Sequence, residues 1–351
     1  MRKISLILFS IFILCAAAFG VSTFLSRNGT GEGRLTSMTE NLGGPDEPLT
    51  HPLQITEMRK QEYPGSDLTI EQTLSAGSNY TRSIASYKSE GLKMFGLLTV
   101  PNGHVPEGGW PAIIFNHGYI SPSVYSTTER YVAYVDGFAR NGYVVFKPDY
   151  RGHGNSEGRA EGAYYSTAYT TDVINAMRSV ERYPNVNPDK IGMWGHSMGG
   201  HITLRTMVAT PDIKAGVIWG GVVVSYRDMA EKWRRGDRPP RPTPTFSHSR
   251  PGRQQLTERY GTFDEHPEFW RSISPIFFVS DISGPVQLHH GLADTTVPWE
   301  FSQSLKTTLD EAGKTAESYT YPGADHNLSG SAFGTAMSRS VSFFDRYLKG
   351  E

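Results

Sequence analysis

The 351-residue sequence contains one cysteine, Cys15, which lies among the first 25 residues. A lone cysteine excludes disulfides within the chain and thiolate metal sites of the zinc-finger type. An excess of charge is missing too, because 34 Lys and Arg residues stand against 35 Asp and Glu residues. Such a balance gives no support for binding nucleic acid through bulk charge. The acids and histidines lack metal-ligand spacing, and Gly152-His153-Gly154 lacks the full dinucleotide fingerprint, so we expect neither metal nor cofactor.

The first 25 residues have the pattern of a targeting segment. Arg2 and Lys3 precede an uncharged run from Ile4 to Ser26. This run predicts either a signal peptide, cleaved near the small residues at 16–18, or an uncleaved anchor through residues 4–26 that is long enough to span a bilayer. Both alternatives predict an exported protein, which is secreted or held at a bacterial cell envelope. Residues 26–79 follow, and we expect a linker and an irregular N-terminal segment there.

From residue 80 onwards, short apolar stretches alternate with helical patterns. A two-residue turn at Glu90-Gly91 predicts a hairpin of strands at 81–89 and 92–100. Further strands are expected at 111–116, 143–147, 191–194, 214–220, 284–291 and 317–321, and helices at 129–141, 167–182, 199–210, 299–312 and 332–348. This alternation predicts one α/β domain over residues 80–351, with a mainly parallel central sheet and helices on both faces.

Residues 225–275 interrupt the alternation, and we expect them to form a cap or lid inserted into the domain. Within them, the segment 232–253 holds seven basic residues and five prolines. Such a composition disfavours regular structure there. Two interpretations remain open for this segment: a cap that bears on ligand choice, with a preference for anionic groups, or a solvated surface loop.

The sequence Gly195-His196-Ser197-Met198-Gly199 lies between a predicted strand and a predicted helix. This G-x-S-x-G pattern in that context predicts a nucleophile elbow, a sharp turn that presents the hydroxyl of Ser197 above a sheet edge. Glycine is expected at 195 and 199 because larger side chains would collide across the turn. The alternative is a glycine-rich helix start with an ordinary N-terminal serine.

A serine hydroxyl needs a base and an orienting carboxylate to act as a nucleophile. Asp294 and His326 each lie on a loop after a predicted strand and before a predicted helix, in the order Ser, Asp, His. Alternatively, Asp294 caps a helix and His326 is a solvated loop histidine. Asp325 is the weaker acid candidate because it shares a loop with His326. The backbone N–H groups of Met198 and Tyr119 are the expected oxyanion donors, with the Tyr119 hydroxyl as an extra candidate.

Several other polar residues have a structural interpretation. His289 and His290 end a strand, and we expect them to pack or to support the site. His196 is expected to pack or to form a hydrogen bond behind the serine. In the turn 149–156, glycines at 152 and 154 predict a tight turn, and Asp149 is expected to pair with Arg151.

Together these motifs resemble the catalytic domain of the prolyl oligopeptidase family, within the α/β-hydrolase superfamily. The resemblance covers about residues 80–350 and rests on the hairpin, Asn116-His117-Gly118, the turn 149–156, Gly195–Gly200, and the Asp294 and His326 loops. Tyr119 and Ile120 stand where family members usually carry glycine and proline. The resemblance implies an α/β-hydrolase fold with Ser197 as nucleophile, Asp294 as orienting acid and His326 as base.

This resemblance predicts a serine hydrolase that cleaves an acyl bond of a small peptide or ester through an acyl-enzyme. About 55 residues separate the leader from the hairpin, too few for the β-propeller that large family members carry. A carboxylesterase acting on small or aryl esters is therefore the alternative. A non-catalytic binding protein on the same fold is the more remote one. The sequence does not indicate an oligomeric state.

Overall fold

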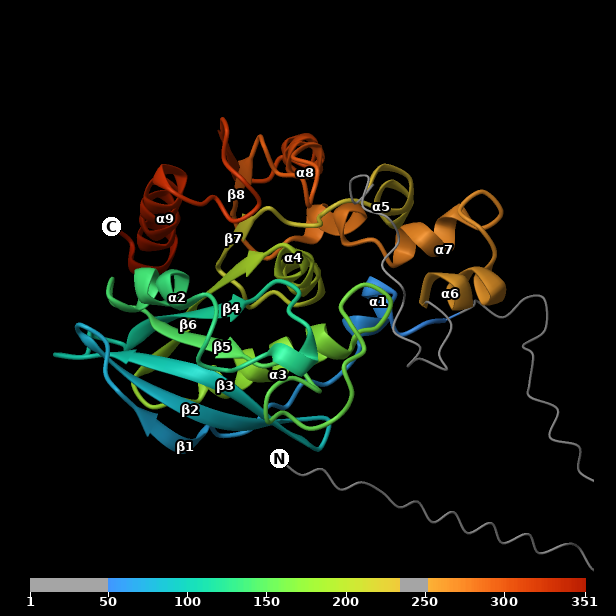
Figure 1. Cartoon of the computed structure of the whole chain (residues 1–351). Helices are drawn as coiled ribbons and strands as arrows, with labels where there is room; N and C mark the ends of the chain where they lie inside the picture. The colour runs from blue at the N-terminus through green and yellow to red at the C-terminus, as the bar shows by residue number, and fades with distance from the viewer. Residues whose placement is uncertain (1–49, 234–251) are drawn as a thin grey trace, which may run out of the picture. The chain divides into compact units, whose positions relative to one another are not determined.

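A computed structural model describes residues 50–233 and 252–351 of the chain (Figure 1). The predicted targeting segment at 1–25, the first part of the predicted linker and most of the basic segment 232–253 lie outside the described residues. In the described ranges, no helix has the length and apolar character needed to cross a bilayer.

The fold is built on a mixed sheet whose strand order is β1-β2-β3-β5-β4-β6-β7-β8-β9. The strands are β1 (Thr69–Leu74), β2 (Tyr80–Ser89), β3 (Leu92–Pro101), β4 (Trp110–Asn116), β5 (Val144–Pro148), β6 (Val186–His196), β7 (Ala215–Trp219), β8 (Val286–Gly291) and β9 (Ala316–Tyr321). From β5 to β9 all neighbouring strands are parallel, whereas β1, β2 and β3 are antiparallel to their neighbours. The predicted α/β-hydrolase fold is confirmed, since the order reverses between β4 and β5 and all the parallel strands end at one edge.

The predicted hairpin is confirmed as β2 and β3, which pair with Ser89 opposite Leu92. Its two turn residues, Glu90 and Gly91, have φ values of 49° and 81°. Positive φ at both positions is the geometry of a type I′ turn, which follows the natural twist of two antiparallel strands. The hairpin therefore continues the sheet from β1 and leads the chain towards its parallel part.

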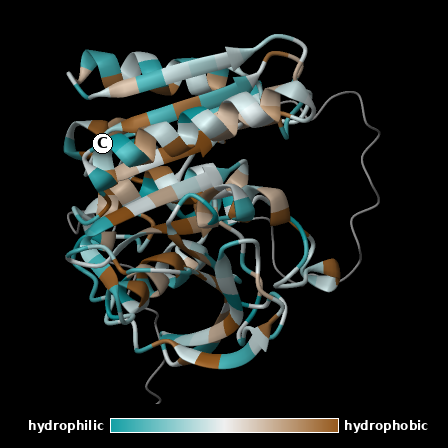
Figure 2. Cartoon of the chain, turned by 90° about the vertical axis from the view of Figure 1, so that its left-hand side faces the viewer, coloured by the Kyte–Doolittle hydropathy of each residue, from teal (hydrophilic) through white to brown (hydrophobic). Residues whose placement is uncertain are grey.

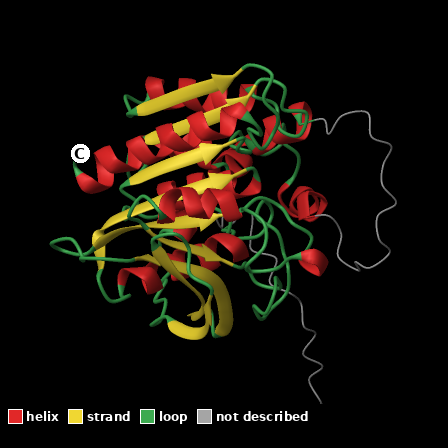
Figure 3. Cartoon of the chain, turned by 60° about the vertical axis from the view of Figure 1, so that its left-hand side comes forward, coloured by secondary structure: helices red, strands yellow, loops and turns green. Residues whose placement is uncertain are grey.

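Helices cover both faces of the sheet (Figure 3). They are α1 (Ile55–Met58), α2 (Val132–Ala139), α3 (Ala168–Glu181), α4 (Met198–Ala209), α5 (Tyr226–Lys232), α6 (Gly252–Tyr260), α7 (Pro267–Ser272), α8 (Glu300–Glu311) and α9 (Ser331–Phe344). Side chains of α3, α4 and α8 form one core with the sheet, and those of α2 and α9 form the other. Strands β5 and β7 are buried at every position because helices pack on both of their sides. Figure 2 shows hydrophobic segments, in brown, on strands that lie between the helices.

The domain begins before residue 80, which corrects the expected linker at 26–79 for its described part, residues 50–79. Residues 69–74 form β1, which pairs with β2 at the edge of the sheet. Upstream, Leu53, Ile55 and Met58 are buried, and Arg59 donates to the carbonyl of Val208 at the end of α4. Strand β1 is exposed along nearly its whole length, so it lacks the apolar alternation by which a strand is recognised in a sequence.

The predicted insertion at 225–275 joins β7 to β8, and its described part is helical, with α5, α6 and α7. These helices share a small core that also includes Leu53 from the N-terminal segment; its members are Leu53, Tyr226, Leu256, Tyr260, Phe269, Trp270 and Ile273. The indole N–H of Trp233, just after α5, donates to the carbonyl of Thr296 at 2.7 Å. The insertion is thereby attached to the loop that carries Asp294.

Candidate active site

Ser197 lies at the junction of β6 and α4 with φ 55° and ψ −118°. A non-glycine residue with positive φ is strained, and such strain is typical of functional turns. A Cβ atom on Gly195 would lie 2.3 Å from the carbonyl oxygen of Gly199, and one on Gly199 would lie 2.0 Å from that of Asn116. Both distances are far inside van der Waals contact, so the steric reason for the two glycines is confirmed.

Asp294 follows β8, and its side chain is fully buried. Its Oδ1 atom accepts the backbone N–H groups of Thr296 at 2.7 Å and Val297 at 2.9 Å. Its Oδ2 atom lies 2.6 Å from Nδ1 of His326 and 3.1 Å from Nε2 of His290. Burial opposes the charged form, but the hydrogen bonds from His290 and His326 outweigh it and hold the pKa of the Asp294 carboxyl well below its usual range. Asp294 is therefore a carboxylate at neutral pH.

His326 follows β9. Its ring is oriented by a hydrogen bond to Asp294 and packs against Gly220. Because the carboxylate is ionised, the 2.6 Å contact places a proton on Nδ1 of His326 and leaves Nε2 as the basic atom. Gly220 has φ 52°, and a Cβ atom there would lie 3.2 Å from Nδ1 of His326. The glycine after β7 thus leaves room for the imidazole, a requirement that its sequence position does not reveal.

The serine and histidine loops meet at His196, the last residue of β6. The rings of His196 and His326 are 4.6 Å apart, and Nε2 of His196 lies 2.9 Å from the carbonyl oxygen of His326. Within residues 50–233 and 252–351, neither the Ser197 hydroxyl nor Nε2 of His326 has a hydrogen-bond partner. The nucleophile–base contact is often long in enzymes without substrate and tightens when substrate binds.

The predicted oxyanion donors lie on the two loops that flank Ser197. Met198 is the first residue of α4, so its N–H has no acceptor within the helix and lies at the positive end of the helix dipole. Tyr119 follows β4, and its backbone N–H has no partner among the described residues. The neighbouring N–H of Gly118 is already used, since it donates to the Tyr131 hydroxyl at 2.9 Å. The Tyr119 side chain is 70% exposed, so its ring stands in solvent.

His290 supports Asp294 from behind, as expected of a residue that packs beside the site. Its Nε2 atom faces two acceptors, Oδ2 of Asp294 and the carbonyl of Val297 at 3.0 Å, and must carry the proton. Its Nδ1 atom then accepts from the Ser302 hydroxyl at 2.7 Å. His289 is fully buried and bonds to Tyr321 and Gln287, which makes it a packing residue.

The turn at 149–156 differs from the expectation in one respect. Arg151 does not pair with Asp149 but with Asp172 of α3 at 2.7 Å, and Asp149 accepts hydroxyls of Tyr125 and Thr127 at 2.5 Å each. Asp172 also accepts the backbone N–H of Arg151 at 3.0 Å, whereas the two oxygens of Asp149 are occupied by the two hydroxyls. The tight turn itself is confirmed, since Gly152 and Gly154 have φ values of 73° and 56°.

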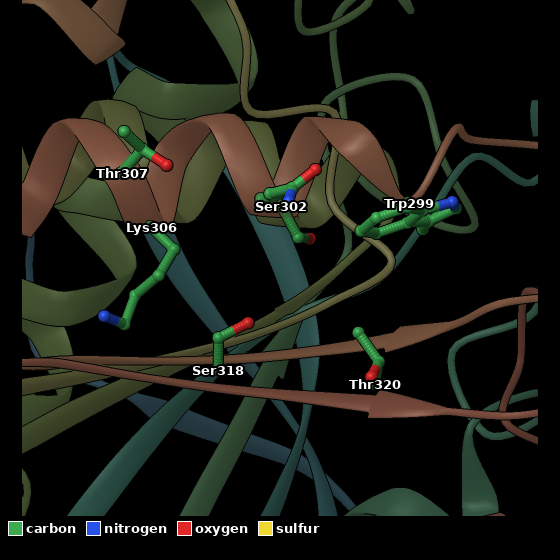
Figure 4. A pocket seen from close by; sticks show the side chains of 7 residues that line it. Trp299, Ser302, Lys306, Thr307, Ser318 and Thr320 are labelled. Atoms are coloured by element: carbon green, nitrogen blue, oxygen red, sulfur yellow. The ribbon is translucent and has the colours of Figure 1, made fainter.

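A surface depression of about 320 Å³ lies between α8 and β9 (Figure 4). Its lining residues are Trp299, Ser302, Gln303, Lys306, Thr307, Ser318 and Thr320. None of Ser197, Asp294 and His326 lines it, although Ser302 connects it to Asp294 through His290. The depression is therefore separate from the three predicted catalytic residues.

Two relatives share similarity with most of this chain. The "uncharacterized peptidase YtmA" of Bacillus subtilis is 28% identical over 244 residues, which cover 68% of this chain and 84% of YtmA. Human dipeptidyl peptidase 8 is 24% identical over 258 residues, covering 70% of this chain and 26% of that protein. The chain therefore spans most of the length of the first relative and about a quarter of that of the second.

Solved structures with the same fold include peptidases and esterases. The acylaminoacyl peptidase of Pyrococcus horikoshii has a TM-score of 0.61 at 23% identity, covering 78% of this chain and 43% of that chain. The acetyl xylan esterase of Paenibacillus sp. R4 has a TM-score of 0.59 at 17% identity, with coverages of 84% and 92%. The prolyl oligopeptidase family matches residues 130–351, a range that holds the elbow and both candidate loops. The chain belongs to the prolyl oligopeptidase family, and its fold is that of the α/β-hydrolases.

Proposed function

We propose that this protein hydrolyses an acyl bond, in the first instance a peptide bond, with Ser197 as nucleophile, His326 as base and Asp294 as orienting acid. The observation that carries this proposal is the 2.6 Å contact between Asp294 and His326, formed by two distant loops at the sheet edge where the strained serine turn lies. Membership of a family of serine hydrolases supports the same assignment.

The catalytic cycle follows from this geometry. Nε2 of His326 takes the proton of the Ser197 hydroxyl while the Ser197 oxygen attacks the acyl carbon. The N–H groups of Met198 and Tyr119 stabilise the oxyanion that forms. The imidazolium then protonates the leaving amine or alcohol, and the acyl–oxygen ester remains on Ser197. Water, deprotonated by His326, hydrolyses this ester and restores the serine. Asp294 stabilises the imidazolium in both halves of the cycle because its carboxylate stays ionised.

Small esters are the second candidate substrates, and a specific observation favours them. The peptidase structure matched here is covered for only 43% of its length, whereas the acetyl xylan esterase is covered for 92%. The part of this chain that matches therefore spans nearly the whole of that esterase but less than half of that peptidase structure. The same acyl-enzyme chemistry serves either bond, so the leaving group and the acyl pocket decide between the two substrate classes.

A substrate panel tests the proposal and separates its branches. Aryl esters of increasing acyl length and aminoacyl or prolyl anilides would be assayed with the wild type and with Ser197→Ala. We expect Ser197→Ala to lower kcat by at least about 1,000-fold on every substrate that is turned over. A fluorophosphonate probe should label the wild type but not the variant. A wild type that remains unlabelled and inactive would instead indicate a binding protein on a hydrolase fold.

We also propose that the protein is exported, on the basis of the charge and hydropathy pattern of residues 1–25. Fractionation of cells that express the full chain tests this proposal. The protein in the medium or periplasm with a new N-terminus indicates cleavage, and the protein in the membrane fraction with its original N-terminus indicates an anchor. Recovery in the cytosol with an intact N-terminus would refute export.

A further inference from the structure

Three hydrogen bonds join the loop after β4 to the loop after β9, passing directly behind Ser197. The N–H of Gly118 lies 2.9 Å from the Tyr131 hydroxyl, which lies 2.7 Å from Nδ1 of His196. Nε2 of His196 lies 2.9 Å from the carbonyl oxygen of His326. The series of bonds begins at Gly118, the residue before Tyr119, whose N–H is a predicted oxyanion donor. It ends at the backbone carbonyl of His326, the predicted base.

The two ends of this series of hydrogen bonds fix the position of every proton within it. A backbone N–H can only donate and a carbonyl can only accept, so the Tyr131 hydroxyl accepts from Gly118 and donates to Nδ1 of His196. Nε2 of His196 then carries the proton that is donated to His326. Burial lowers the pKa of His196 to about 3, which keeps the ring in this neutral tautomer at neutral pH.

The backbone around Tyr131 is strained in a way that holds its hydroxyl in place. Arg130 and Tyr131 both have positive φ, 56° and 54°, immediately before α2. Two consecutive non-glycine residues in this region cost free energy and persist only where the surroundings impose them. One turn later, the Tyr134 hydroxyl donates to the carbonyl of Asn327 at 2.9 Å, next to His326. The start of α2 is therefore joined to the base loop directly through Tyr134 and indirectly, through His196, by Tyr131.

We propose that Tyr131 and His196 form a positioning bridge that holds the oxyanion loop and the base loop in register about Ser197. The proposal rests on the proposed function, because it assigns the two residues to the geometry of that reaction. Loss of the Tyr131 hydroxyl frees the Gly118 amide, which changes the direction of the next amide, that of Tyr119. Loss of the His196 N–H frees the carbonyl of His326, which loosens the orientation of its ring. Neither residue touches the substrate, so turnover should change and substrate binding should not.

Kinetics of two variants on p-nitrophenyl acetate test the bridge. Tyr131→Phe keeps the ring and removes both hydroxyl bonds, and His196→Leu keeps the volume and removes the N–H. Each should lower kcat roughly tenfold, the size of one positioning hydrogen bond, with KM within about twofold of wild type. His196→Gln, whose amide N–H can reach the carbonyl of His326, should recover at least about threefold in kcat over His196→Leu.

Tyr143→Phe is the matched control, because it removes another buried hydroxyl, bonded to Asp345 at 2.7 Å, on an element away from the site. It should keep the wild-type kcat. Wild-type kcat in both Tyr131→Phe and His196→Leu, while Ser197→Ala is inactive, would overturn the bridge and leave the proposed function standing. An active Ser197→Ala would instead overturn the proposed function. If His196→Leu fails to fold, the result for Tyr131→Phe decides.

Discussion

Replacing Asp294 with asparagine should inactivate the protein through the tautomer of His326. Oδ1 of Asp294 already accepts two backbone N–H groups, so an asparagine oxygen would occupy that position. The amide NH₂ would then replace Oδ2 and face His326 and His290, both of which donate a proton to it in the wild type. Two donors cannot face each other, so His326 would move its proton to Nε2 and could no longer accept one from Ser197.

The expected loss in kcat is about 10³- to 10⁴-fold, or about 4–5.5 kcal/mol of transition-state stabilisation. Steady-state turnover of p-nitrophenyl acetate, with thermal unfolding as a check on folding, measures it. Asp325→Asn is the matched control, because Asp325 is an exposed acid next to His326 that accepts the backbone N–H groups of Asn327 and Ser329 and has no contact with the His326 ring among the described hydrogen bonds. It should change kcat less than about threefold. A folded Asp294→Asn that keeps more than a tenth of wild-type kcat would refute this reasoning.

Three further predictions concern stability. The pKa of His196 is lowered to about 3 in the folded state, below its unfolded value of about 6.5. The free energy of unfolding that neutral His196 contributes is therefore fully present above pH 6.5 and is lost as pH falls towards 3. Urea unfolding should show a smaller loss of stability on acidification in His196→Gln than in the wild type. Gly199→Ala places a Cβ atom 2.0 Å from a backbone carbonyl and should lower the free energy of unfolding by more than about 3 kcal/mol, as measured by thermal unfolding. Gly334→Ala, which lies in open space on α9, is the control and should be neutral or stabilising in the same measurement. Asp172→Ala removes the buried partner of Arg151 and leaves only the exposed carboxylate of Glu90 beside it, so this variant should cost up to about 3–5 kcal/mol by urea titration with kcat within about threefold. An equal loss of kcat would place this pair in the active site.

The features that could be predicted from the sequence are those with a local signature. The serine turn is recognised from five residues between a strand and a helix, and Asp294 and His326 are recognised because each follows an apolar strand. The alternation of strands and helices was enough to predict a mainly parallel sheet, because buried parallel strands are recognised as continuous apolar runs. The oxyanion roles of Tyr119 and Met198 remain predictions, and they are supported by a Tyr119 amide that has no partner within the part of the chain that the structure describes.

Other features depend on contacts between distant segments and leave no local trace. Tyr131 stands at an ordinary helix start in the sequence, and its role depends on Gly118 and His196, which reach it only in the folded chain. Arg151 has an acid two residues away, yet it pairs with Asp172 of α3, 21 residues further along the chain. Spacing along the chain favours the nearest partner, whereas in the folded protein the direction of each side chain decides.

The early start of the domain has a practical consequence for anyone who trims this chain. A recombinant protein that begins at residue 80 would lack β1, and the backbone donors and acceptors of β2 that face it would become an open edge. Open edges of this kind promote self-association between molecules. The same cut would remove Ile55 and Met58 from their contact with α4 and expose apolar surface next to this helix, which begins directly after Ser197. Aggregation of such a truncated chain would thus result from the loss of β1, which covers the edge of β2, and not from a defect in the proposed catalytic residues.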